Sequence, residues 1–360
     1  MHILKPFFAL SNNLFFLLLG IFGIGFIIGF HELGHFLFGK LFHIKTPSFS
    51  IGFGPKIYKR KIGETQFSIS AIPLGGYVES DRESFESKPY YQKMLVIGGG
   101  IGFNLLFAYI VFCILFLTGI PKTRFLYPLN TSPVVQAVAK EQEIEKLGLK
   151  AGDRILSIND IQIGSNTKAL FQHIKDAKTK TLKLTLSRGN DMLTLNLPTG
   201  ELMKAFGTFK IRFQFIQKSG LPFFRAIREG IRLTNTFIAN TLLIFKYIFV
   251  KRDVSGVGGP ILIISETVKS ASKGFKIFLL FLAIISISLA VINLIPLPIL
   301  DGGQALLYTV EAITRKKLAE KTKEYIFIVS WIFMIFLFVL ISARDIWRIV
   351  SPYFAKFLKK

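Results

Sequence analysis

The sequence predicts an integral membrane protein: an α-helical bundle of about four transmembrane helices with a β-hairpin and an inserted soluble domain. Hydrophobic residues make up 51% of the 360-residue chain, and they gather in long runs that carry no charge. Soluble proteins have about 45–50% apolar residues and do not concentrate them in this way. Long uncharged runs are typical of helices that cross a bilayer.

The charge balance is strongly basic, with 45 Lys and Arg against 22 Asp and Glu and a formal net charge of +23. In a soluble protein this excess would favour nucleic-acid binding, but the sequence has no nucleic-acid-binding motif. Basic residues that flank membrane spans bind anionic headgroups and determine topology. The lipid bilayer is therefore a predicted partner, and nucleic acid is not. A single cysteine, Cys113, excludes an internal disulfide and a cysteine-rich metal site.

The first predicted span covers residues 14–38, and we expect it to be retained rather than cleaved as a secretory signal. Its apolar run is longer than the central region of a signal peptide, and no small-residue cleavage site closes it. The loop after it, residues 40–93, carries nine basic residues (positions 40, 45, 56, 59, 60, 61, 82, 88 and 93), whereas the preceding segment has Lys5. The positive-inside rule therefore places this loop in the cytoplasm.

This cytoplasmic loop contains a predicted β-hairpin over about residues 48–78. Residues 48–51 and 65–72 alternate polar and apolar side chains, and glycine and proline residues lie between them. Alternation with a period of two is typical of strands, and the glycines and proline indicate turns and bends.

The second predicted span covers residues 94–117 and contains Gly98–Gly100 and Gly102, which we interpret as sites of close helix packing. The polar residues 120–220 after it predict a small β-rich domain on the outer side of the membrane. Its candidate elements are a short helix at 167–177 and strands at 134–138, 154–158, 181–186 and 192–197.

The segment 222–250 is ambiguous between an interfacial helix and a further span. Arg225, Arg228 and Arg232 share a helical face, which favours a helix lying in the interface, but residues 236–250 are apolar enough to cross. The last two predicted spans are 275–300 and 325–341. The expected parts of the chain are therefore an N-terminal membrane part (1–119), a soluble domain (120–205), a linker with the interfacial helix (206–272) and a C-terminal membrane part (273–360).

The first apolar run ends in the motif His31-Glu32-Leu33-Gly34-His35. Positions i and i+4 share one face of a helix, so both imidazoles can bind one metal ion. Glu32 lies beside that face, where it could hold and deprotonate a water molecule at the metal. This H-E-x-x-H arrangement is typical of hydrolytic zinc sites. The alternative is a structural, hydrogen-bonded pair of histidines.

A catalytic zinc site needs a third protein ligand, and Asp301 is the candidate. The other histidines lie at exposed flanks or in the soluble domain, which favours a carboxylate. An acid at membrane depth costs roughly 2.5–3.5 kcal/mol on insertion scales, so it usually has a partner such as a metal. Pro296 and Pro298 just before it break the helix and free backbone groups for a substrate. The alternative role of Asp301 is to cap a helix.

The number of spans decides whether these three residues can meet. Four spans bring His31, His35 and Asp301 to the same side of the bilayer. A fifth span at 236–250 would place Asp301 across the bilayer from the histidines. If the metal site exists, the segment 222–250 lies on the membrane or dips into it without crossing.

These motifs resemble those of the bacterial site-2 intramembrane zinc metalloproteases of the regulator-of-sigma-E protease type. The resemblance covers nearly the whole chain and is carried by His31–His35, Pro73–Val78, Phe85, Lys88, Tyr91–Lys93, Gly148–Asp153 and Asn293–Gly303. It implies zinc bound by His31, His35 and Asp301, with Glu32 as the general base. It also implies that the soluble domain is a PDZ-like α+β domain.

The resemblance further implies substrate contacts at Asn293, Asn104, Gly75 and Gly76. The hairpin would add the unwound substrate as an extra strand. The chain departs from the family at Gly100-Ile101-Gly102-Phe103-Asn104, where the family has Gly-Pro-x-x-Asn, because the asparagine is present and the proline is not.

The predicted function is that of a zinc-dependent intramembrane endopeptidase that cleaves single-pass transmembrane proteins. The resemblance implies anti-sigma factors or remnant signal peptides as substrate classes, and the bacterial cytoplasmic membrane as the location. The alternative is a membrane-anchored PDZ-type peptide-binding protein with a structural or inactive metal site. The presence of Glu32 favours the enzyme, because a structural site does not need it. A transporter is a weaker alternative, because four spans and one ligand cluster are few.

Overall fold

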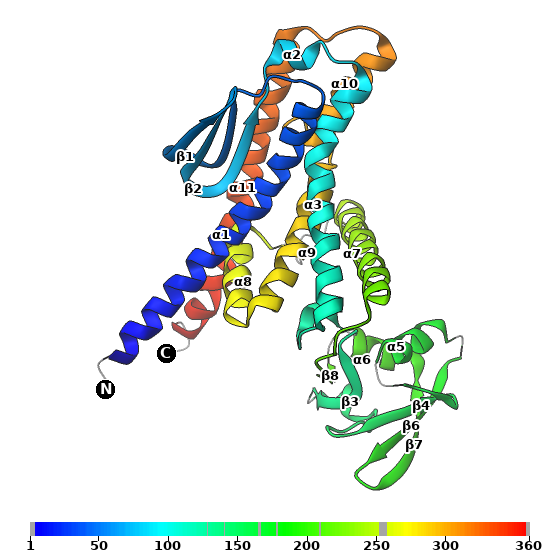
Figure 1. Cartoon of the computed structure of the whole chain (residues 1–360). Coiled ribbons are helices and arrows are strands. Elements are labelled where there is room, and N and C mark those ends of the chain that lie inside the picture. Colours follow the sequence, from blue (N-terminus) through cyan, green and yellow to red (C-terminus); the bar gives the residue numbers. More distant parts are fainter. Residues whose placement is uncertain are drawn as a thin grey trace. The chain divides into compact units, whose positions relative to one another are not determined.

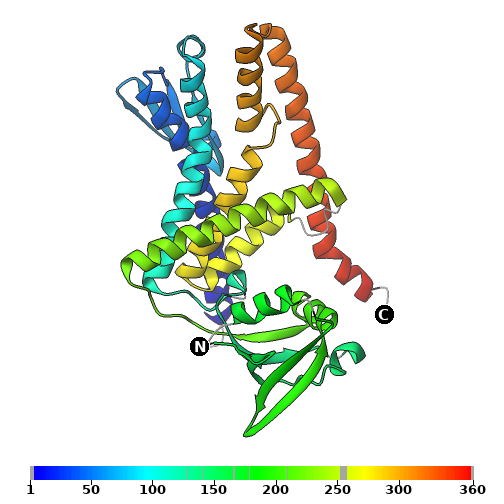
Figure 2. The same cartoon turned by 90° about the vertical axis from the view of Figure 1, so that its right-hand side faces the viewer.

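The computed structural model describes residues 4–357 apart from 128, 140, 165–166, 178, 209 and 252–257, and the last of these gaps lies in the predicted linker. The chain forms two compact units, shown in Figures 1 and 2. The membrane unit comprises Met1–Ile114 and Phe223–Lys360, and the inserted unit comprises Leu115–Pro222. The sequence predicts a shorter soluble domain, residues 120–205, within the range of this inserted unit.

Four helices in the described part of the chain are long and apolar enough to cross a membrane. They are Leu14–Leu41 of α1 (Leu4–Leu41), α3 (Tyr90–Thr118), α9 (Phe275–Asn293) and Glu320–Arg348 of α11 (Glu320–Phe357). The prediction that the third of these spans reaches residue 300 was wrong, because α9 ends at Asn293. Pro296 and Pro298 explain this end, since proline cannot continue a helix and disfavours helical geometry in the residue before it.

Two further helices follow the inserted unit and pack on the bundle. The helix α7 (Phe223–Lys251) is not one of the four candidate spans, and its Arg228 and Arg232 side chains are exposed. It contacts α9, and Gly230 packs against Cys113 of α3. Figure 2 shows α7 crossing these helices at a steep angle. The helix α8 (Pro260–Ser272) contacts α1, α9 and α11.

The predicted hairpin is present as β1 (Ser48–Ile62) and β2 (Thr65–Glu79), and it is longer and more curled than the alternation indicates. Residues 48–51 of β1 pair with 66–69 of β2 on one side and with 76–79 on the other. Two glycines with φ near +90°, Gly52 and Gly54, allow the bend that makes this double pairing possible. The sheet packs on α1 through β2 (Figure 1), so residues 76–79 form an edge close to the H-E-x-x-H segment.

The inserted unit is built on a sheet with the strand order β7-β6-β4-β3-β8, and β5 also pairs with β4. The strands are β3 (Thr131–Val138), β4 (Arg154–Ile158), β5 (Ile161–Gln162), β6 (Thr181–Arg188), β7 (Asp191–Pro198) and β8 (Ile211–Phe215). The helices are η1 (Arg124–Leu126), α4 (Gln142–Glu145), α5 (Thr167–Asp176) and α6 (Thr199–Gly207). Pairing of β8 with β3 extends this unit into the segment that the sequence assigned to the linker.

One buried acid anchors a turn of the inserted unit. Asp153 is fully buried and accepts two hydrogen bonds from Arg188 and one from the backbone N–H of Lys150. Burial opposes the charge of Asp153, but these hydrogen bonds outweigh it and lower the pKa of the carboxyl. Arg188 also donates to the carbonyl of Gly148, so a single guanidinium joins β6 to the Gly148–Asp153 turn.

Candidate metal centre

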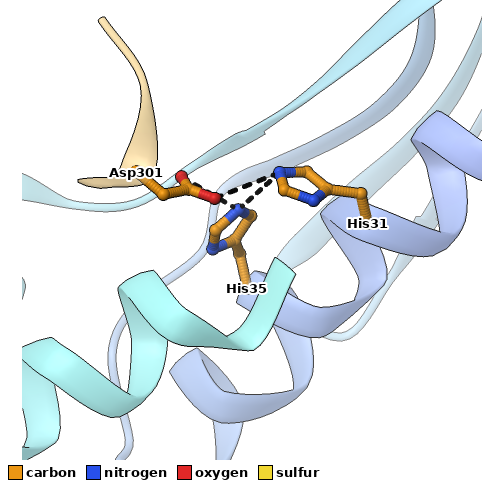
Figure 3. A group of neighbouring side chains, drawn as sticks. All are labelled: His31, His35 and Asp301. Atoms are coloured by element: carbon orange, nitrogen blue, oxygen red, sulfur yellow. Dashed lines mark hydrogen bonds and ion pairs between the residues drawn. The ribbon is translucent and has the colours of Figure 1, made fainter. Parts of the chain in front are cut away.

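Three side chains from two helices meet in the membrane unit (Figure 3). His31 and His35 lie one turn apart on α1, and their Nε2 atoms are 3.1 Å apart. Asp301 is the first residue of α10 (Asp301–Thr314), and its Oδ2 lies 3.3 Å from His31 Nε2. Its Oδ1 lies 3.5 Å from His35 Nε2. The structure therefore brings together the three residues that the sequence predicts as metal ligands.

The spacing of these atoms fits a tetrahedral zinc ion. Nitrogen and oxygen ligands bind zinc at about 2.0–2.2 Å, which places two such atoms about 3.3–3.5 Å apart in a tetrahedron. The two imidazole nitrogens and the nearest Asp301 oxygen of each, Oδ2 for His31 and Oδ1 for His35, are separated by distances close to that value. In addition, the buried Asp301 Oδ2 has no hydrogen-bond partner, and a buried acceptor without a partner is costly. A cation between the three side chains would remove that cost.

The non-helical segment between α9 and α10, residues 294–300, positions Asp301 next to the histidines. Gly302 and Gly303 lie against the backbone of this segment, because an added Cβ would come within 2.4 Å of Leu294 O and 2.1 Å of Leu297 O. Any other residue would push α10 away from the end of α9. The alternative reading of Asp301 as a helix cap was wrong, since the cap residue is Leu300 and no side chain caps α10.

A cavity of about 570 Å³ opens on the three side chains. The residues predicted to act in catalysis or in binding metal and substrate all line it: Gly75, Gly76, His31, Glu32, His35, Asn104, Asn293 and Asp301. Glu32 faces the edge of the hairpin, because a Cβ on Gly76 would lie 3.1 Å from Glu32 Cγ. The Val78 backbone also forms a hydrogen bond with Glu32, so the carboxyl group, the ligand cluster and the edge of β2 share one space.

Residues 19–337 match the pattern of peptidase family M50. The chain belongs to peptidase family M50. The matched range includes His31, His35 and Asp301. The chain is also similar to curated relatives called "putative zinc metalloprotease". The Clostridium perfringens relative is 29% identical over 88% of this chain and 94% of its own length. The Clostridium acetobutylicum relative is 30% identical over 93% of this chain and 98% of its own length. The Campylobacter jejuni relative is 29% identical over 91% of this chain and 92% of its own length.

In this M50 peptidase the second ring nitrogen of each histidine also has a partner. His35 Nδ1 lies 2.9 Å from the carbonyl oxygen of Val96, and His31 Nδ1 lies 3.1 Å from the side-chain amide of Asn104. Both partners belong to α3. The Val96 carbonyl accepts a hydrogen bond from Nδ1–H of His35 and so selects the tautomer that leaves Nε2 free for a metal, and the Asn104 amide orients the ring of His31.

Gly100 is a site residue that the sequence analysis did not single out. We interpreted the glycines of α3 as packing sites, and Gly99 fits that role because its added Cβ would lie 2.7 Å from Gly34 O of α1. Gly100 faces the ligands instead, since its Cβ would lie 2.4 Å from His35 Nε2 and 2.5 Å from His31 Cε1. Its position one helical turn before Asn104 is the signal that could have indicated this.

Proposed function

We propose that this M50 peptidase is a zinc-dependent intramembrane endopeptidase that cleaves single-pass transmembrane proteins. The observation that carries the proposal is the position of Glu32 beside a three-residue ligand cluster in one cavity. Three ligands with an open fourth position are typical of catalytic zinc, whereas structural zinc sites are closed by four. The four apolar helices support a membrane location for the reaction.

The chemistry follows from the residues that line the cavity. His31, His35 and Asp301 would hold the zinc ion, which when bound acidifies a water molecule and polarises a carbonyl group. Glu32 accepts the proton of the attacking water and then donates it to the departing amine of the cleaved peptide. The same carboxyl group thus acts as a base and then as an acid.

The substrate must be unwound before it can react, because a helical peptide bond is shielded by its own turn. The edge at residues 76–79, where the Val78 backbone already hydrogen-bonds to Glu32, would offer its remaining backbone groups to an extended peptide, which would add to the hairpin as a strand. Gly75 and Gly76 line the same cavity and pack closely against Phe53 and the Ser50 carbonyl. Asn293 would contact the substrate backbone from the end of α9. These roles rest on the shared cavity of about 570 Å³.

The topology that accompanies this function places the hairpin and the metal centre towards the cytoplasm in a bacterial cytoplasmic membrane. The basic loop of residues 40–93 supports this orientation. The inserted unit, which we propose is PDZ-like, would lie on the outer side and bind or exclude substrate ectodomains. The resemblance to the regulator-of-sigma-E type favours anti-sigma factors or remnant signal peptides as substrates.

Substitution of Glu32→Gln tests the mechanism. The variant should lose cleavage of a model single-pass substrate in detergent or liposomes, because glutamine cannot accept the proton. Its zinc content should remain close to that of the unaltered protein, because Glu32 is not one of the three ligands. Glu64→Gln, at an exposed position in the turn of the hairpin, is the matched control and should retain activity. Full activity of the Glu32→Gln protein would refute the mechanism.

A further inference from the structure

We propose that Asn104 is a positioning residue for the metal ligand His31 and that Ser286 holds Asn104 in place. The three residues belong to three different helices, α1, α3 and α9. The inference rests on zinc binding at this centre, which is part of the proposed function, and not on peptide cleavage. It differs from the substrate contact that the resemblance implies for Asn104.

The contact lies on the side of the His31 ring away from the other ligands. His31 directs Nε2 towards His35 and Asp301, and its Nδ1 is 3.1 Å from the Asn104 amide. Asn104 is 0% exposed. Because a fully buried amide cannot exchange its partner for bulk water, this hydrogen bond has a high cost if it is lost.

Metal binding determines which way the asparagine amide must point. A neutral imidazole that offers the Nε2 lone pair to a metal carries its proton on Nδ1, and this proton needs an acceptor. In the structure the Asn104 amino group, a donor, faces Nδ1. The two ends of an asparagine amide have nearly the same shape, so we expect the opposite orientation, with Oδ1 accepting from His31, in the zinc-bound protein.

Ser286 completes this arrangement. Its hydroxyl donates to the backbone carbonyl of Asn104 at 2.8 Å and lies 3.4 Å from the end of the side-chain amide. With Oδ1 turned towards His31, the Asn104 amino group would face Ser286 Oγ and donate to it. Every polar group in the chain from His31 to Ser286 would then have a partner. Ser286 is also 0% exposed, so no solvent substitutes for it.

The second histidine shows why Asn104 matters for His31 in particular. The Nδ1 of His35 faces the backbone carbonyl of Val96, which no side-chain substitution removes. The Nδ1 of His31 faces the side chain of Asn104, and the backbone of Gly100 also forms a hydrogen bond with His31. Loss of the Asn104 amide would therefore weaken the positioning of His31, and zinc would bind less tightly.

The test measures zinc affinity of the full chain in detergent by competition with a chromogenic chelator, in a Glu32→Gln background so that cleavage plays no part. Asn104→Ala should bind zinc roughly 10–100-fold more weakly, as is usual when a ligand's hydrogen-bond partner is removed. Ser286→Ala should show a smaller loss in the same direction. Asn104→Asp, which keeps an acceptor for Nδ1–H, should restore most of the affinity.

The matched control is Ser288→Ala on the same helix, because the Ser288 hydroxyl bonds to the carbonyl of Ile284 within α9. It should leave zinc affinity unchanged. If Asn104→Ala does not fold, the zinc affinities of Asn104→Asp and Ser286→Ala are compared with that of this control. Equal zinc affinity in Ser286→Ala and the control would overturn the proposal.

An Asn104→Ala protein with unaltered zinc affinity would also overturn the proposal. If that substitution, made with Glu32 intact, raised the KM for a model substrate, the contact with substrate would be the correct role. The variants could show the expected order of zinc affinities while the protein with Glu32 intact cleaves no substrate. That result would contradict the proposed function but not the role of Asn104.

Discussion

At Gly100 the metal centre has no room for a side chain. An added Cβ would lie within 2.5 Å of both imidazole rings. Neither ring can move away without losing its contact with Asp301 or with its hydrogen-bond partner on α3. The neighbouring glycines of the same helix differ: a Cβ on Gly98 or Gly102 would meet nothing within 4 Å. The three positions therefore form a natural set for substitution.

We predict that Gly100→Ala lowers zinc affinity at least about tenfold, by displacing the two imidazoles that bind the ion. Gly98→Ala and Gly102→Ala should bind zinc normally, since both positions face open space. The measurement is the same chelator competition, with far-UV circular dichroism to show that the helices are intact. Equal zinc affinity in all three variants would contradict the geometry of α1 and α3 described above.

At the scale of the elements, a buried cluster of charges joins α2 (Arg82–Glu86) and α3 to α10 and α11. Lys93 lies 2.8 Å from Glu86, and Lys323 lies 2.9 Å from Glu311 and 3.5 Å from Glu86. Both lysines are 7% exposed. Tyr308 donates to Glu86 at 2.8 Å, and both ammonium groups lie over its ring.

This charge cluster holds the helix that begins with Asp301. Burial alone would raise the pKa of Glu86, but hydrogen bonds from Lys93 and Tyr308 and the charge of Lys323 lower it to about 2. The carboxylate is therefore charged in the folded protein at any neutral pH. Since α10 also carries Tyr308 and Glu311, the cluster fixes the position of α10 against α2 and α3.

We predict that Lys323→Met destabilises the protein by about 3 kcal/mol, because it leaves Glu311 buried with no cation beside it. The thermal unfolding midpoint in detergent should fall, and zinc affinity should fall with it as α10 loosens. Lys321→Met is the matched control, because Lys321 lies in the same turn of α11 and is exposed. An unchanged midpoint would show that the cluster contributes no net stability.

At the scale of the whole molecule, we propose that the four candidate spans of the described residues all cross the membrane. The proposal requires the hairpin on the side of the membrane where both His31 and Asp301 arrive. It requires the inserted unit, which follows the second span, on the opposite side. The helix α7 decides between this arrangement and one with five spans, and its exposed arginines favour a position at the interface.

Labelling with a membrane-impermeant maleimide tests this topology in intact cells. With Cys113 replaced by serine, we predict that Asn190→Cys in the inserted unit is labelled from outside. Lys61→Cys in the hairpin should be labelled after the membrane is opened. Both positions are exposed, so accessibility to the reagent depends on the side of the membrane. Labelling of both positions from outside would show that α3 does not cross the membrane between the hairpin and the inserted unit, and would refute the proposed topology.

Local patterns in the sequence determined much of this protein. Long apolar runs predicted the four candidate spans, alternation predicted the hairpin, and the i, i+4 spacing placed two imidazoles on one face of α1. These features depend on a few neighbouring residues and on the periodicity of helices and strands. They can therefore be predicted from the sequence without a tertiary structure. The end of α9 at Asn293 was placed too late, although Pro296 and Pro298 are a local signal for it. The pairing of β8 was missed, because it depends on the distant strand β3.

The tertiary structure alone decided how the distant parts of the metal centre meet. His31 and Asp301 lie in different helices far apart in the sequence, and their 3.3 Å approach depends on glycines that let α10 pack on the end of α9. The roles of Gly100 and Asn104 likewise follow from the packing of α3 on α1. A glycine that packs helices and one that makes room for a metal ligand have the same sequence signal, and only the side chain across the interface distinguishes them.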